Sequence, residues 1–440
     1  MPRKSQPKLI VNRSKYTRLL SKYKEMLESL DSRHRVVRNP RFSELVNFKT
    51  NKNIPRHRWF DYKQGYSAEL VESILEKEAP CKECYVLDPF AGVGTTNVVA
   101  QALGYKSIGF DINPVATFAA NVKTAYYSDD EKREAKQLIK SFSPKKPTST
   151  PNSPLLGSSF SKRMFDQLMS IKGFYEDIEN LKIQSLLKLA YISIVEDCSN
   201  RVKDGNGIKI VRNKQEILDA YSYYIERIAL MLKDIEEVNR VSEATIITGS
   251  MLRDEDFNLV KDKEVGVVIF SPPYANCFDY CEVYKLELWM GEFVSRYKDF
   301  RKYRSMAIRS HVNSKFDHTI KNPNASVDLI SDIISCFNIW NRNIPDMIRG
   351  YFDDMTELFR KLYEVMIPNS KCFIVVANSG YKGIIVPTDL LLVEIADTFG
   401  LKSKEICYAR KIRASSQQMT DLHERYENLM RESILVLEKS

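Results

Sequence analysis

The segment that most constrains the fold is Asp88-Pro-Phe-Ala-Gly-Val-Gly-Thr-Thr96, in which a glycine-rich turn joins two apolar runs. Residues 85–88 before the turn predict a strand, and residues 95–103 after it predict a helix. The same order follows at once, since residues 106–111 predict a strand and residues 114–122 a helix. Strands that alternate with helices form parallel sheets covered on both faces, so the sequence predicts a doubly wound α/β fold.

The alternation is interrupted twice before it ends. The first interruption begins with a Ser-, Pro- and Thr-rich linker at 141–161 and is then mainly helical, with predicted helices at 164–175, 183–197 and 215–238. The second, at about 291–345, starts with basic and aromatic residues. The other predicted strands lie at 244–248, 265–270, 371–376, 403–409 and 433–437, and the other helices at 347–363 and 388–399.

Positive charge is concentrated at the N-terminus. Residues 1–60 contain 16 Lys and Arg against 4 Asp and Glu, a net charge of +12, whereas the whole chain carries +9. Within this stretch residues 15–30 predict a helix and residues 31–58 an irregular connector. A basic arm on a near-neutral body is typical of nucleic-acid-binding proteins, because each neutralised phosphate releases counterions. A solubilising tail is the alternative.

Several classes of protein are disfavoured by composition. No apolar run approaches the roughly 20 residues of a membrane span, and the N-terminus lacks the apolar core of a signal peptide. The eight cysteines form no framework, Cys81-Lys-Glu-Cys84 is a lone pair, and the five histidines do not cluster. We therefore expect free thiols in a reducing cytosol and no metal site.

The glycine turn and the second strand together predict a nucleotide-cofactor site. Gly92 and Gly94 carry no Cβ, so a ligand can approach the backbone and the helix N-terminus. The spacing is not the GxGxxG of dinucleotide sites, and no Lys follows the glycines as in a phosphate-binding loop. Asp111 ends the next strand, where a carboxylate accepts hydrogen bonds from ribose hydroxyls, and Ile112 would lie beside an adenine ring. A nucleoside cofactor without a phosphate-binding lysine fits S-adenosylmethionine; a purely structural turn is the alternative.

A second motif, Ser271-Pro-Pro-Tyr274, follows the apolar strand at 265–270. Its prolines have no N–H and a fixed φ, so the segment is stiff and its carbonyls are unpaired. The Ser271 hydroxyl and the Pro272 carbonyl can accept both hydrogens of an exocyclic amine, and the Tyr274 ring offers a stacking face. Such acceptors localise the lone pair on the amine nitrogen, which favours attack on a methyl group. A strand-ending turn is the alternative interpretation.

Aromatic residues follow the second motif. A base inside a duplex must be flipped out of the stack before an enzyme can modify it. Phe278, Tyr280 and Tyr284 are candidates to clamp such a base, and ordinary packing of a helix is the alternative.

These segments resemble the motifs of the bacterial amino-group DNA methyltransferases. Residues 88–96 and Asp111-Ile-Asn-Pro114 resemble the cofactor motifs, and Ser271-Pro-Pro-Tyr274 resembles the catalytic motif of the N4-cytosine branch. Residues 59–67 resemble the segment that contacts the methionine end of the cofactor, and residues 431–437 resemble the last strand of the family.

The resemblance implies a fold and a set of site residues. The fold would be a Rossmann-like S-adenosylmethionine methyltransferase sheet, mostly parallel with an antiparallel C-terminal strand, plus helical insertions. The catalytic residues would be Ser271, Pro272, Pro273 and Tyr274. The cofactor contacts would be Gly65, Ser67, Asp88, Pro89, Phe90, Gly92, Gly94, Thr95, Asp111, Ile112 and Ser250.

Two features depart from the family. Gly249-Ser250 stands where many relatives have a Gly-Asp pair for the adenine amine, and Ser250 is a weaker acceptor. About 120 residues separate the second cofactor unit from the third, so we expect bases to be read in this insertion and at 291–345. Arg and Asn suit guanine and adenine edges, and a plain polar surface loop is the alternative. The candidates lie in a polar loop at 199–209 and are Asn200, Arg201, Lys203 and Asn206.

The implied organisation is a basic N-terminal arm (1–55), a helical insertion (126–240) and a catalytic domain in two parts (56–125 and 241–440, the latter interrupted at about 291–345). The implied activity is methyl transfer from S-adenosylmethionine to N4 of cytosine in double-stranded DNA. We expect it in the bacterial cytoplasm, associated with the nucleoid and paired with a cognate restriction endonuclease. N6-adenine methylation, amino methylation of RNA and an inactive DNA-binding subunit are the alternatives.

Overall fold

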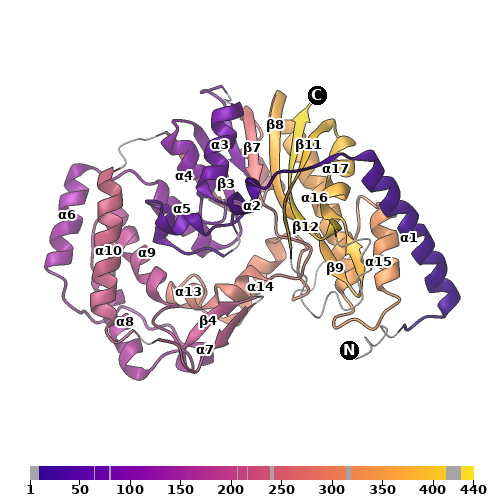
Figure 1. Cartoon of the computed structure of the whole chain (residues 1–440). Helices are drawn as coiled ribbons and strands as arrows, with labels where there is room; N and C mark the ends of the chain where they lie inside the picture. Colours follow the sequence, from indigo (N-terminus) through magenta and orange to yellow (C-terminus); the bar gives the residue numbers. More distant parts are fainter. Residues whose placement is uncertain are drawn as a thin grey trace.

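The computed structural model describes residues 9–63, 65–78, 81–205, 207–215, 217–237, 242–313, 319–412 and 428–440. At its centre is an eight-stranded sheet in the order β1-β11-β12-β8-β7-β2-β3-β6 (Figure 1). The strands are β1 Val36–Arg38, β2 Tyr85–Asp88, β3 Lys106–Asp111, β6 Ala244–Thr248, β7 Val265–Phe270, β8 Met366–Ala377, β11 Leu401–Lys411 and β12 Arg431–Lys439.

The direction of the strands agrees with the prediction. Neighbouring strands run parallel except at β12, which is antiparallel to both β8 and β11. The predicted Rossmann-like sheet with an antiparallel C-terminal strand is therefore confirmed. One strand was missed, because β1 lies within the stretch predicted to be an irregular connector and pairs with the edge of β11.

Helices cover both faces of the sheet, and the central strands are buried on both sides. Val267 and Ile269 of β7 pack against α3 (Ala68–Glu78) and α4 (Thr95–Ala102). Val268 and Phe270 point the other way, toward α16 (Ile344–Val365) and α17 (Thr388–Asp397). Successive side chains of a strand point to opposite faces, so the unbroken apolar run of β7 needs both layers.

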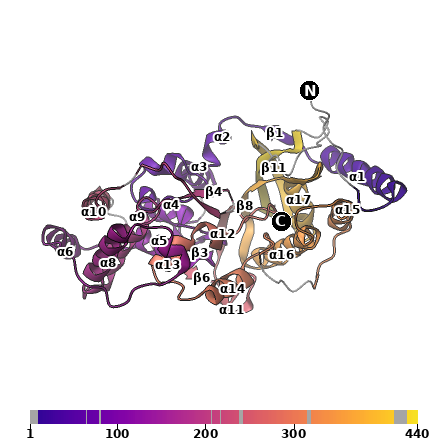
Figure 2. The same cartoon turned by 90° about the horizontal axis from the view of Figure 1, so that it is seen from below.

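The insertion forms a helical layer beside α5 (Pro114–Thr124) and shares one hydrophobic cluster with α5 and with Trp59 and Phe60. In Figures 1 and 2 it lies at the opposite end of the molecule from α1 (Arg13–Arg33). Its helices are α6 Asp129–Lys140, α7 Pro154–Gly157, α8 Lys162–Glu176, α9 Leu181–Ile194 and α10 Ala220–Glu237. The shorter helices elsewhere are α2 Phe42–Leu45, α11 Asp254–Phe257, α12 Tyr280–Val283, α13 Lys285–Met290, α14 Tyr297–Met306 and α15 Ala325–Ile334.

The basic N-terminal segment is in large part a packed helix, not a free arm. Helix α1 lies against α15 and α17 (Figure 1). The Tyr23 hydroxyl donates to the Ile385 carbonyl at 3.0 Å and accepts from the Ile385 N–H at 2.8 Å. Tyr23 and Leu27 are almost fully buried, because apolar residues at helical spacing need a partner surface.

The segment predicted as a polar loop at 199–209 is a hairpin, which corrects that prediction. It consists of β4 (Arg201–Asp204) and β5 (Gly207–Ile210), paired antiparallel. A second small hairpin joins β9 (Ser379–Tyr381) and β10 (Ile384–Val386). Asn206 lies outside the described residues.

The cysteine prediction is wrong for one pair, since Cys81 and Cys84 form a disulfide. The other six cysteines are free and buried. Within the ranges given above, no three His, Cys, Asp or Glu residues are grouped to hold a metal ion. A search of the same ranges for a helix long and apolar enough to cross a membrane found none.

Candidate active site

The glycine turn between β2 and α4 can be built only with glycine at two positions. Gly92 and Gly94 have φ of +51° and +78°, in the left-handed region that other residues avoid. A Cβ on Gly92 would lie 2.9 Å from Tyr62 Cε1, and one on Gly94 would lie 2.8 Å from the Ala120 Cβ. Both the backbone conformation and the close neighbours therefore require glycine.

The Asp88 carboxylate stabilises this turn through three hydrogen bonds. Its Oδ2 accepts from the Tyr66 hydroxyl and from Thr96 Oγ1, each at 2.7 Å, and its Oδ1 accepts from the Phe90 N–H at 3.0 Å. Burial raises the pKa of the Asp88 carboxyl to about 6, although these hydrogen bonds oppose the shift. The carboxylate thus ties the turn to residues 59–67, whose Tyr66 it binds.

Asp111 fixes the turn from the side and also faces a cavity. Its Oδ2 accepts from the Gly92 N–H at 2.9 Å, and its Oδ1 accepts from the Asn113 N–H at 2.8 Å. Burial raises its pKa to about 6 against the effect of these hydrogen bonds. A carboxylate at the end of the second strand is suitably placed to accept from ribose hydroxyls.

The cavity at the ends of β2, β3 and β6 contains about 700 Å³ of empty space, part of it open to solvent. Five of the predicted cofactor residues line it: Pro89, Phe90, Asp111, Ile112 and Ser250. The predicted residues Asp88, Gly92, Gly94 and Thr95 do not line it and instead shape the turn beneath it. Ser67 caps α3, because its Oγ accepts from the Leu70 N–H at 3.1 Å.

Gly249 and Ser250 end β6 beside a carboxylate that the sequence did not reveal. Asp256 Oδ2 accepts from the Ser250 N–H at 2.9 Å. A Cβ on Gly249 would lie 2.5 Å from that oxygen. The acid in this part of the site therefore comes from α11 and not from position 250.

Ser271 and Tyr274 stand at the end of β7, between two cavities. Ser271 Oγ donates to the Val375 carbonyl at 2.9 Å and lies 3.4 Å from the Tyr274 hydroxyl. The Tyr274 hydroxyl donates to Glu432 Oε1 at 2.7 Å. Ser271 and Tyr280 line both the cofactor cavity and a second cavity of about 380 Å³. The two cavities therefore meet at the predicted catalytic motif.

The second cavity lies over β7, β8, β12 and β11. Gly65 lines it, whereas Pro273 lines the cofactor cavity and Pro272 is buried outside both. Its other lining residues are Val46, Asn47, Lys63, Tyr66, Ser271, Tyr274, Tyr280, Val375, Arg410 and Glu432. Sequence analysis missed Arg410 and Glu432, because other charged residues stand beside them in both strands and the pattern does not single them out.

The aromatic residues after the motif form the wall toward the cofactor. Phe278 and Tyr280 line the first cavity, with their ring centroids 4.7 Å apart in an edge-to-face arrangement. Tyr284 does not line it and stacks on Tyr62 at 5.1 Å. Arg304 of α14 also lines this cavity and is fixed by Asp279 at 2.8 Å.

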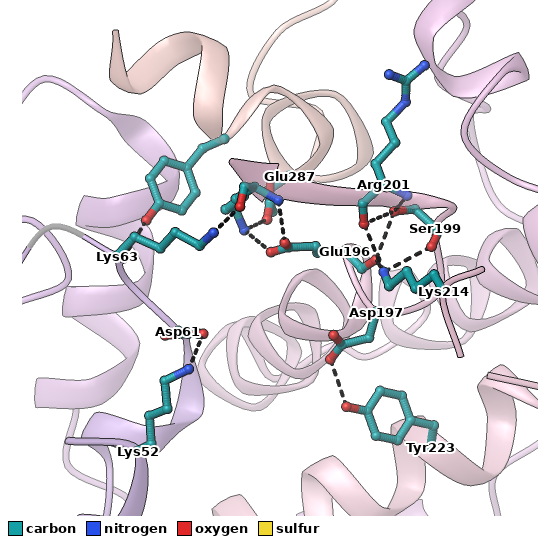
Figure 3. Close-up of polar contacts among 12 residues, drawn as sticks. Lys52, Asp61, Lys63, Glu196, Asp197, Ser199, Arg201, Lys214, Tyr223 and Glu287 are labelled. Carbon is teal, nitrogen blue, oxygen red and sulfur yellow. Dashed lines mark hydrogen bonds and ion pairs between the residues drawn. The ribbon is translucent and has the colours of Figure 1, made fainter. Parts of the chain in front are cut away.

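The residues predicted to read bases hold the hairpin to its surroundings. Lys203 is only 5% exposed, and its Nζ pairs with Glu196 and Glu287. In Figure 3 the side chains of Glu196 and Glu287 point toward one another, whereas that of Arg201 points away. Arg201 Nε donates to Ser159 Oγ at 2.6 Å, and Asn200 Nδ2 donates to the Ser158 carbonyl at 2.9 Å.

The sheet order, the glycine turn and the carboxylate at the end of β3 define the class of protein. Together they form the fold and pocket of an S-adenosylmethionine-dependent methyltransferase. The pocket fits this cofactor: Asp111 and Ile112 line it and would offer ribose an acceptor and adenine an apolar contact, and the turn holds no phosphate-binding lysine.

Comparisons with known proteins find similarity to DNA methyltransferases. The model of the DNA methylase family N6_N4_Mtase matches residues 8–121. The chain is 26% identical to the Type II methyltransferase M.BsoBI of Geobacillus stearothermophilus, over 90% of this chain and 88% of that protein. It is likewise 26% identical to the Type II methyltransferase M.AvaI of Anabaena variabilis, over 87% and 86% of the two chains. These matches support the amino-group DNA methyltransferase family that the motifs resemble.

Among solved structures, the rRNA methyltransferase aviRa from Streptomyces viridochromogenes aligns with 84% of each chain at 10% identity and a TM-score of 0.31. That score is too low to support an argument.

Proposed function

We propose that this chain methylates the N4 amine of cytosine in duplex DNA, as the modification enzyme of a restriction–modification system. The observation that carries the proposal is the hydrogen bond from Ser271 Oγ to the Val375 carbonyl. Because the hydroxyl hydrogen is used there, the oxygen lone pairs stay free to accept from an amine where the two cavities meet.

The chain's own groups would bind and orient both partners. S-adenosylmethionine supplies a methyl group on a positively charged sulfur. Asp111 and Ile112 would hold its nucleoside, while Ser271 Oγ would accept one of the amine hydrogens. Tyr274, whose hydroxyl is held by Glu432, would stack on the flipped base. The amine proton leaves after transfer, so no strong base is required at Ser271.

Two features support the finer parts of the proposal. The motif begins with a neutral Ser, and in this it resembles the catalytic motif of the N4-cytosine branch. The relatives carry the name Type II methyltransferase, the class that marks host DNA against a partner endonuclease. A bacterial cytoplasmic enzyme associated with the nucleoid would fit this role.

Ser271→Ala tests the assigned role. Removing one hydrogen-bonding group that acts on the reacting amine should lower the single-turnover rate by about 100-fold. Cofactor affinity, measured by calorimetry, should stay within about twofold. Ser305→Ala is the matched control, since that hydroxyl is exposed and bonds only the Lys302 carbonyl of its own helix. An unchanged single-turnover rate would remove Ser271 from the mechanism.

The product identifies the substrate. DNA methylated with labelled cofactor is digested, and the modified nucleoside is identified by mass spectrometry. N4-methylcytosine supports the proposal, and N6-methyladenine replaces it with the adenine alternative. Label in RNA alone indicates an RNA methyltransferase, and no label in any nucleic acid indicates a binding subunit.

A further inference from the structure

The far wall of the second cavity is formed by two charged residues from the last two strands. Arg410 of β11 lies directly opposite Glu432 of β12 in the antiparallel register. Arg410 Nε donates to Glu432 Oε2 at 2.5 Å, and Glu432 Oε1 accepts from the Tyr274 hydroxyl. Glu432 is 3% exposed, so this carboxylate is buried and both of its oxygens are occupied.

This contact orients the Arg410 guanidinium. Glu432 engages only Nε, and within the described part of the chain neither terminal nitrogen of Arg410 has a partner. The outer edge of a guanidinium carries two parallel N–H groups in a rigid fork. The side chain is 38% exposed and lines the cavity that also contains Ser271, so its outer edge is available to a bound base.

Lys63 is the other cationic residue among those that line this cavity. Lys63 Nζ donates to the Lys203 carbonyl. Among the described residues that line the cavity, Arg410 is therefore the cation whose two terminal nitrogens both lack a partner. The Lys63 ammonium is held at the Lys203 carbonyl and presents no fork of parallel donors.

The two candidate bases differ at the edge next to the amine. Cytosine presents N4 as a donor and then N3 and O2 as acceptors. Adenine presents N6 as a donor, N1 as one acceptor and then a C–H group. With the amine at Ser271, two parallel N–H donors match cytosine in both positions and adenine in only one.

We infer that Arg410, oriented by Glu432, selects cytosine by donating two hydrogen bonds to N3 and O2 of the flipped base. This inference rests on the proposed function and adds a second determinant of base choice to Ser271. A site built to hydrogen-bond its substrate rejects analogues that lack the partner group, because once the base covers the site its own donors are left unpaired.

The experiment compares cytosine and adenine at the target position. The recognition sequence is first identified by modification-sensitive sequencing of DNA from an expressing host. Two duplexes then carry cytosine or adenine opposite the same guanine. The enzyme and its variants are compared by kcat/KM on each duplex, so that differences in flipping between the duplexes cancel.

Arg410→Met removes the donors and keeps an aliphatic stem. It should lower kcat/KM on cytosine by about 5- to 150-fold, the usual value of one bidentate contact to a base, and change adenine by less than about threefold. Arg410→Lys should fall between the wild type and Arg410→Met, because one ammonium group cannot reproduce the fork. The matched control is Lys404→Met, on the same strand but paired with Glu438 at the surface.

The outcomes separate the two proposals. Equal losses on cytosine and adenine, with cofactor affinity and thermal unfolding unchanged, would overturn the role of Arg410 and leave the proposed function intact. A wild-type enzyme whose product in host DNA is N6-methyladenine would overturn both. If Arg410→Met does not fold, Arg410→Lys decides, and an unchanged cytosine-to-adenine ratio in that variant counts against the inference.

Discussion

The two halves of the site are built in different ways. The cofactor half draws on consecutive strand ends, with Pro89, Phe90, Asp111 and Ile112 within 24 residues of one another. The other half joins residues from opposite ends of the chain, from Gly65 to Glu432. A pocket at the ends of neighbouring parallel strands can therefore be predicted from short sequence motifs. A pocket that also needs the antiparallel C-terminal strands cannot, because its residues are far apart in the sequence.

Their hydrogen bonds differ in the same way. In the cofactor half, the Asp111 carboxylate binds backbone N–H groups of its own and the preceding turn. In the other half, side chains bind one another across strands, as Tyr274 and Arg410 do through Glu432. Local backbone geometry follows from short motifs, but a cross-strand network depends on the whole sheet.

The largest expected effect concerns Lys203, which the sequence suggested as a DNA contact and the structure buries. Burial lowers its pKa, but the charges of Glu287 and Glu196 more than offset this and raise it. Lys203→Met would leave two carboxylates without their cation, which should cost about 3–5 kcal/mol of unfolding free energy. Denaturant unfolding at neutral pH measures this loss.

Lys209→Met is the control for Lys203, because its ammonium pairs with Asp204 on the exposed face of the same hairpin. It should change stability by less than about 0.5 kcal/mol. If Lys203→Met keeps its stability but binds DNA weakly, the prediction that Lys203 contacts DNA is correct.

The next prediction concerns Asp111 in the cofactor half and the pH dependence of ligand affinity there. Since burial raises the pKa of Asp111 to about 6, its carboxyl is ionised above that pH and protonated below it. Only the ionised form keeps lone pairs for ribose hydroxyls beyond those used by Gly92 and Asn113. Affinity for the product S-adenosylhomocysteine should therefore fall by up to about tenfold per pH unit below 6.

Titration calorimetry between pH 5 and 8 measures this dependence. Asp111→Asn should bind weakly at every pH, with a flat profile. If that variant keeps the slope, the titrating group is Asp88, whose pKa burial also raises to about 6. Cofactor affinity would then depend on Asp88, which stabilises the glycine turn, more than on Asp111, which lines the cavity.

The sheet was predictable because each strand carries its own signal. The predicted bounds of β2, β3, β6 and β7 agree with the structure, since each is a short apolar run between turns. Ser271 and Asp111 were found because they follow such runs. Motif analysis also selected Asp88, but pattern alone could not show that Tyr66 and Thr96 occupy its carboxylate.

The remaining residues carried no such signal. Arg410 and Glu432 interact through strand register, which links positions 22 apart. Glu432 also binds Tyr274, which is 158 residues away from it. The hairpin at Arg201–Asp204 was assigned to a loop because its residues are polar. Lys203 was assigned to the surface because a lysine is rarely buried, and only the tertiary structure brings Glu196 and Glu287 to it.

The smallest expected effect is on DNA affinity and concerns which of two basic helices, α14 or α1, binds DNA close to the site. Lys298, Arg301 and Lys302 of α14 lie on one exposed helix face, and none has a partner among the described residues. The same helix carries Arg304 into the cofactor cavity, whereas α1 packs at the far end of the sheet. Phosphates flanking a flipped base must pass close to the cavity, so the position of α14 favours it over α1.

Replacing these three residues of α14 by Ala should weaken DNA binding several-fold at about 0.15 M salt. It should also reduce the slope of log Kd against log salt by about 2.7, since each phosphate contact contributes about 0.9. The matched control replaces three exposed cations of α1, Lys15, Arg18 and Lys22, and should leave the slope unchanged. Fluorescence anisotropy across a salt series measures both. The opposite result would mean that DNA crosses the α1 end of the sheet and that the N-terminal charge, visible in the sequence from the start, marks the binding surface.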